Sequence, residues 1–178
     1  MSMSKKWNHP ELGAFEFDHS GWVRPHDFPA FNKFTYEADE ESECEFPLVF
    51  EAAAETVLPS AAAVAAAQRV IANQKTLVTT IVEALWEDFN GRGPDSGMWW
   101  HGDLGSVSEN LEEMDLVIPR KPADLLPLLS LSAVIVRHKD QLVELCFGAP
   151  FEEEHGIGIL TDGKTVLGTG YSSDVMPF

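Results

Sequence analysis

The sequence predicts an α+β fold, in which a mainly antiparallel sheet packs against one long central helix and a short second helix. Three observations predict it. Apolar and polar residues alternate in the first sixty residues, residues 61–90 contain neither Pro nor Gly, and short strand-like segments return after residue 130. The length predicts a single domain, 1–178, in which residues 1–10 form a flexible N-terminal tail.

The N-terminal third is predicted to be an antiparallel meander with one face in water. The alternation falls in three segments: 12–17, 34–36 and 46–50. Pro47 lies inside the last segment and cannot donate a ladder hydrogen bond, so it indicates an edge position or the start of a strand.

The middle of the chain is predicted to be a helix that Ser60 caps and Asn90-Gly91 ends. Its apolar stripe contains Val64, Ala67, Ile71, Val78, Ile81, Leu85 and Phe89. The polar residues 73–75 indicate a kink or a break into two helices. A partner-binding coiled coil uses such a seam too, but the repeat lasts under about four heptads and begins with alanines, which favours packing on the sheet.

The last part of the chain is predicted to alternate between turns and strands. Residues 91–119 are rich in Gly and read as turns, whereas Pro122 is suited to start a short helix over 122–129 that Pro127 limits. Four strand segments follow, with the hairpin signal Asp162-Gly163 between the last two: 131–136, 141–147, 156–160 and 165–167.

The charge is strongly and unevenly negative, with 12 Lys and Arg against 29 Asp and Glu, a formal net charge of −17. Residues 11–55 hold twelve acids and two bases, residues 94–178 hold fourteen acids and five bases, and residues 56–93 balance. Such a field opposes binding to nucleic acid and favours a basic protein partner. The alternative is that the acidity only keeps the protein in solution.

The N-terminus shows no signal peptide, and the longest apolar run, 61–67, is too short to span a membrane. We therefore expect a cytoplasmic protein without a membrane partner. Cys44 and Cys146 are expected to be free thiols. The motif of an esterase nucleophile and the phosphate-binding glycine loops are missing from the sequence, so we predict no enzymatic activity, no cofactor and no metal. The oligomeric state is left open.

The segment 151–156 is the best chemical candidate, since three carboxylates and His155 lie within four residues. Phe151 stands where an inverted zinc-protease motif needs His. A small metal-dependent hydrolase around Glu154 and His155, completed by His101 and Asp103, is therefore the alternative function. The simpler interpretation is a solvated acidic turn whose imidazole bonds locally.

We predict instead that acidic and aromatic residues bind a basic partner. In one interpretation Trp99 and Trp100 anchor the partner, and in the other they cover the core between helix and sheet. The predicted partner-binding residues are Glu40, Glu41, Glu43, Trp99, Trp100, Glu152, Glu153 and Glu154.

Four motifs give the chain a resemblance to a family of uncharacterised bacterial proteins. They are His9-Pro10-Glu11-Leu12-Gly13-Ala14-Phe15, the helix with Gln68 and Asn73, Glu154-His155-Gly156-Ile157-Gly158-Ile159, and Val166-Leu167-Gly168-Thr169-Gly170. The spacing of Gln68 and Asn73 is shorter than in the family pattern, which also has an aromatic residue followed by Asp near Phe151. Members of such families look like neighbours of toxin genes, so the resemblance implies an immunity role by association. It supplies no catalytic residues.

Overall fold

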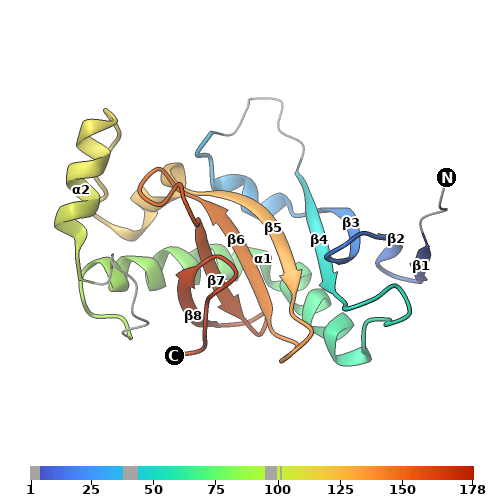
Figure 1. Ribbon diagram of the computed structural model, residues 1–178. Coiled ribbons are helices and arrows are strands. Elements are labelled where there is room, and N and C mark those ends of the chain that lie inside the picture. Colours follow the sequence, from blue (N-terminus) through green and yellow to red (C-terminus); the bar gives the residue numbers. More distant parts are fainter. Residues whose placement is uncertain (1–4, 38–43, 95–99, 101) are drawn as a thin grey trace.

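The computed structural model describes residues 5–37, 44–94, 100 and 102–178, which form one eight-stranded sheet covered by helices (Figure 1). The strands follow one another across the sheet in chain order, and every pair is antiparallel except β4 and β5. The α+β prediction is confirmed. The strands are β1 Lys6–His9, β2 Gly13–Phe17, β3 Gly21–Asp27, β4 Glu45–Glu51, β5 Ser130–Val136, β6 Val143–Gly148, β7 Ile157–Thr161 and β8 Val166–Tyr171.

The long helix α1, Ala61–Phe89, belongs to the connection from β4 to β5 and covers one face of the sheet (Figure 1). A parallel pair needs such a crossover, because a tight turn can only join antiparallel strands. The Ser60 hydroxyl caps the helix by accepting from the Ala63 amide at 3.1 Å, as predicted, and Asn90 ends it. Within the described residues, none of the helices combines the length and the apolarity that a membrane crossing needs.

The helix continues through residues 73–75, where a kink or break was the expectation. The polar side chains there bond to neighbouring elements instead. The Gln74 amide oxygen accepts from the backbone N–H of Ala30 at 3.1 Å, and the Asn73 amide donates to the Gly163 carbonyl at 2.8 Å. These residues therefore tie α1 to the segments on either side of it.

The strand predicted at 34–36 is wrong. A 3₁₀ helix that begins at Pro29, η1 Pro29–Lys33, ends just before these residues, and the chain then continues without a strand into a turn. Phe28, Phe31 and Phe34 are all buried, and their spacing of three residues is the repeat of a 3₁₀ helix. Phe34 thus belongs to a pattern that repeats every three residues rather than to a strand-like alternation that repeats every two.

A second helix, α2 Leu104–Glu113, lies inside the region predicted as turns. The Asp103 carboxylate accepts from the Ser106 amide at 3.4 Å and caps it, while Val107 and Leu111 are buried one turn apart. The short helix predicted over 122–129 is a 3₁₀ helix, η2 Pro122–Leu128.

The prediction of a flexible tail over residues 1–10 is wrong in part, because some of these residues form a strand. Residues 6–9 form β1, and Trp7 stands opposite Phe15 of β2. Pro47 faces Pro25 across β3 and β4, just before the residues of β4 that pair with β5. It therefore lies near the start of a central strand, where its missing N–H is tolerated.

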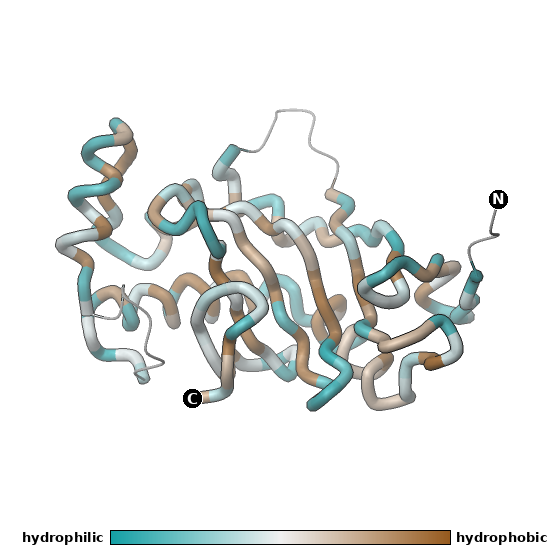
Figure 2. The backbone as a smooth tube through the Cα atoms, viewed as in Figure 1, coloured by the Kyte–Doolittle hydropathy of each residue, from teal (hydrophilic) through white to brown (hydrophobic). Residues whose placement is uncertain are grey.

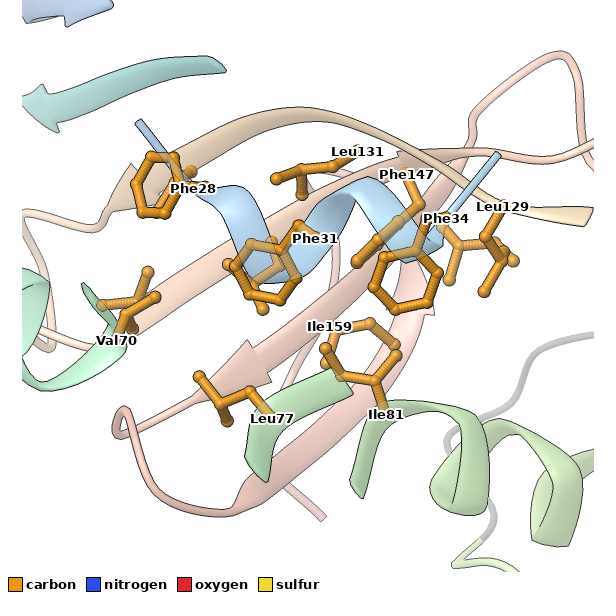
Figure 3. Close-up of a cluster of buried hydrophobic side chains, with 14 of the residues drawn as sticks. Phe28, Phe31, Phe34, Val70, Leu77, Ile81, Leu129, Leu131, Phe147 and Ile159 are labelled. Atoms are coloured by element: carbon orange, nitrogen blue, oxygen red, sulfur yellow. The ribbon is translucent and has the colours of Figure 1, made fainter. Parts of the chain in front are cut away.

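The core fills the space between α1 and the sheet (Figure 3). Figure 3 shows the three phenylalanines of the η1 segment between side chains of the helix and side chains of the strands. Phe31 and Leu77 are fully buried, and the Phe34 ring lies edge-on to Phe147 with its centroid 4.8 Å away. The tube in Figure 2 is correspondingly hydrophobic along the central strands.

The second face of β6–β8 is covered by the C-terminal strap, which we define as residues 172–178. The Phe178 amide donates to the Leu167 carbonyl at 2.8 Å, and Arg137 donates to the Val175 carbonyl at 2.7 Å. The buried carboxylate of Glu144 accepts from the Ser173 amide at 2.6 Å. Strands β6 and β7 are therefore buried on both faces.

Candidate protein-binding surface

The acidic turn between β6 and β7 folds tightly onto the core. The Phe151 ring is buried edge-on against Phe89, with centroids 5.3 Å apart. The Gly156 amide donates to the Glu152 carbonyl at 3.1 Å and closes the turn. Glu152 is 8% exposed, whereas Glu153 and Glu154 point into solvent. The three consecutive acids thus divide into one structural carboxylate and two exposed ones.

His155 pairs with Glu152 rather than with the adjacent Glu154. The Glu152 carboxylate lies 3.1 Å from the imidazole Nδ1 and also accepts from the His155 backbone N–H at 3.2 Å. The ring lies on Tyr171, with 4.8 Å between the centroids. This is the local hydrogen bonding that the simpler interpretation of the segment predicted.

Glu37 and Glu153 both lie close to Tyr36. The pKa of Tyr36 is raised by burial and then by the negative charges of Glu37 and Glu153, which come from opposite ends of the sequence. The Tyr36 amide donates to the Leu129 carbonyl at 3.0 Å and fixes the backbone there. The fold therefore brings Glu37 and the acidic turn, which are distant in the sequence, close to the same tyrosine.

Tyr171 on β8 also lies close to acidic side chains. Its pKa is raised by burial and then by Glu152 and Glu154. Together the exposed and half-buried residues Tyr36, Glu37, Glu153, Glu154 and Tyr171 form what we call the acidic surface. Sequence reasoning missed both tyrosines and Glu37, since only the tertiary contact with the turn distinguishes them from other polar residues.

The remaining predicted partner-binding residues divide into two groups. Glu40, Glu41, Glu43 and Trp99 lie outside the described residues, and the first three follow Glu37 along the chain. Trp100 is fully buried, with its ring edge-on to Tyr171 at 5.4 Å, so it belongs to the core and offers no surface to a partner.

The residues proposed to complete a hydrolase site are not gathered by the described structure. Asp103 caps α2, and His101 lies outside the described residues. Among residues 5–37, 44–94, 100 and 102–178, there is no group of three His, Cys, Asp or Glu side chains that is suited to hold a metal ion.

Two of the sequence motifs have structural explanations. The His9 imidazole accepts from the amides of Glu11 and Leu12 at 3.3 and 3.2 Å, which shapes the turn between β1 and β2. Gly156 has a φ of +67°, a conformation that L side chains rarely adopt, and a Cβ there would lie 2.7 Å from the Phe147 carbonyl oxygen.

Neither the curated proteins nor the solved structures contain a match. A family model described as a domain of unknown function, DUF6985, matches residues 11–176, nearly the whole described fold. The chain therefore belongs to the DUF6985 family.

Proposed function

We propose that this chain is a non-enzymatic binding domain that engages a basic protein through the acidic surface. The observation that carries the proposal is that Glu37 and Glu153, which are distant in the sequence, both lie close enough to Tyr36 for their negative charges to raise its pKa. The net charge of −17 adds a long-range field of the same sign. Such a field steers a cationic partner and accelerates its encounter.

The finer form of the proposal is an immunity protein that neutralises a basic toxin such as a nuclease. An acidic surface of this kind occupies the cleft in which a nuclease holds phosphates, since carboxylates and phosphates bind the same cationic groups. Tyr36 and Tyr171 give the surface flat, partly apolar area beside its charges, a combination typical of interfaces.

The experiment is a cross-linking pull-down from the native cell, followed by affinity measurements on the basic protein recovered. The variant E37K/E153K/E154K reverses the exposed acids of the surface. The matched control, E16K/D27K/E55K, changes the net charge equally at exposed acids elsewhere. We expect the first variant to lose the partner and the control to keep it, with affinity falling steeply as salt rises.

Equal losses in both variants would mean that only the overall charge matters, and unchanged binding in the surface variant would refute the site.

The alternative function, a small metal-dependent hydrolase, would be centred on the Glu152–His155 pair. It ranks second because this pair has no third metal-ligating group beside it among the described residues. Stoichiometric metal in the purified protein, lost in H155A, would reverse that ranking.

A further inference from the structure

A groove runs along the outer side of α1, where η1 and η2 lie against it. It consists of two hollows of about 570 and 330 Å³ that meet at Lys33. Its floor is apolar, with contributions from all three helices: Ala30, Ile71, Val78, Val82 and Leu126. Hollows of this size accommodate several side chains of a docked segment.

The rim of the groove has the opposite charge to the rest of the molecule. Lys33, Lys75 and Lys121 all line it and are exposed, and Glu83 is the acid among its lining residues. Three of the chain's 12 basic residues therefore surround one apolar groove in a protein with 29 acids. The groove is complementary to a ligand with apolar side chains set among carboxylates.

The end of α2 has that chemistry. Met114 and Val117 are large apolar residues with 41% and 67% of their surface exposed. The acids around them in sequence are also exposed: Glu109, Glu112, Glu113 and Asp115. The sequence has no Lys or Arg between Arg92 and Arg120. In Figure 1, α2 projects from the side of the sheet rather than lying on it. We call residues 109–117 the α2 tip.

We propose that the groove receives the α2 tip of a second copy of this chain, and that two copies exchange these tips in a symmetric dimer. A two-fold axis makes each contact occur twice, so tip and groove must both belong to the face that meets the partner. Only residues 118–120 separate Val117 at the tip from Lys121 at the rim. Met114 and Val117 enter the apolar floor, and the lysines face the acids.

The energetics assign different roles to the two kinds of residue. Apolar anchors that become fully buried at the centre of an interface supply most of its affinity. Exposed ion pairs contribute little individually, so the lysines and acids set which surface pairs with which. The dimer contact uses neither Tyr36 nor Glu153, so it stands independently of the acidic surface.

The test is sedimentation velocity on the full chain and two charge-reversed variants. K33E/K75E/K121E has an acidic groove, and E112K/E113K/D115K has a basic tip. Each variant alone places like charges in contact and is expected to be a monomer. Their equimolar mixture restores opposite charges at both contacts and is expected to form dimers. The control K6E/K139E/K164E reverses three exposed lysines elsewhere and should stay dimeric.

The apolar contribution is tested separately by Val117→Asp. Since this side chain is largely exposed, the folded protomer should keep its circular dichroism spectrum while the dimer dissociation constant rises at least about ten-fold. A monomeric wild type overturns the proposal. So does a dimer that survives both charge-reversed variants, or a mixture that stays monomeric.

Discussion

Gly168 on β8 offers a sharp test of the C-terminal strap. A Cβ at this position would lie 2.1 Å from the carbonyl oxygen of Met176 and 3.0 Å from its carbonyl carbon. Because these atoms belong to the strap backbone, no side-chain rotation relieves the clash. Gly168→Ala therefore forces the strap away from the sheet by more than about 1 Å, against the hydrogen bond from the Phe178 amide.

The magnitude follows from the cost of overpacking a close contact. We expect Gly168→Ala to lower the free energy of unfolding by about 1–3 kcal/mol. Gly105 in α2 is the matched control, since a Cβ there would meet nothing within 4 Å. Gly105→Ala should raise the free energy of unfolding by roughly 0.5–1 kcal/mol, because alanine favours the helix. Replacing Gly with Ala should thus lower the free energy of unfolding at position 168 and raise it at position 105.

Two measurements check this prediction. Urea denaturation gives both free energies, and thiol labelling of the native protein locates the change. Burial and then the charge of Glu144 raise the pKa of Cys146 to about 12, while Ser172 of the strap hydrogen-bonds its sulfur. Displacing the strap should therefore speed the labelling of Cys146 and leave Cys44 unchanged. If Gly168→Ala alters neither the stability nor this rate, the strap does not lie where we describe it.

Three further predictions concern other parts of the fold. Phe31→Ala should lower the free energy of unfolding by about 3–5 kcal/mol, since this ring is fully buried between helix and sheet; a loss below about 1 kcal/mol would contradict the position of η1. Ser60→Ala should cost about 0.5–2 kcal/mol through the lost cap, whereas Ser60→Asp should retain most of that stability. Alkaline absorbance titration of the chain's two tyrosines should give pKa values above about 10. Glu153→Gln should lower the pKa of Tyr36 and leave that of Tyr171, and a uniform response would argue against their separate acidic neighbours.

The tyrosine shifts also fix the direction of the stability change at high pH. The folded protein holds both phenolic protons more tightly than the unfolded chain does, so the unfolded chain binds fewer protons above its own tyrosine pKa of about 10. The contribution to stability is therefore constant below that pH and is lost as pH rises through the folded pKa values. Chemical denaturation across this range checks the sign.

Local sequence patterns predict a helix or strand correctly where residues within that element determine its structure. The cap at Ser60 and the stripe that includes Val64 and Leu85 predict α1, because both depend on residues within one helix. Alternation and the Asp162-Gly163 turn likewise predict β5 to β8. The wrong predictions beside η1 and at α2 have one cause. Aromatic residues three apart and a glycine-rich start fit more than one local structure, and burial against α1 and the sheet selects among them.

The fold class, the long helix and the negative charge can be predicted from the amino-acid sequence, since they depend on composition and on spacing along the chain. Which charges act together depends on the tertiary structure. It brought Glu37 and Glu153 close to the same tyrosine, buried Trp100 and gathered three lysines around one groove. Contacts between residues far apart in the sequence depend on how the sheet and helices pack, and no pattern within a single segment encodes that arrangement.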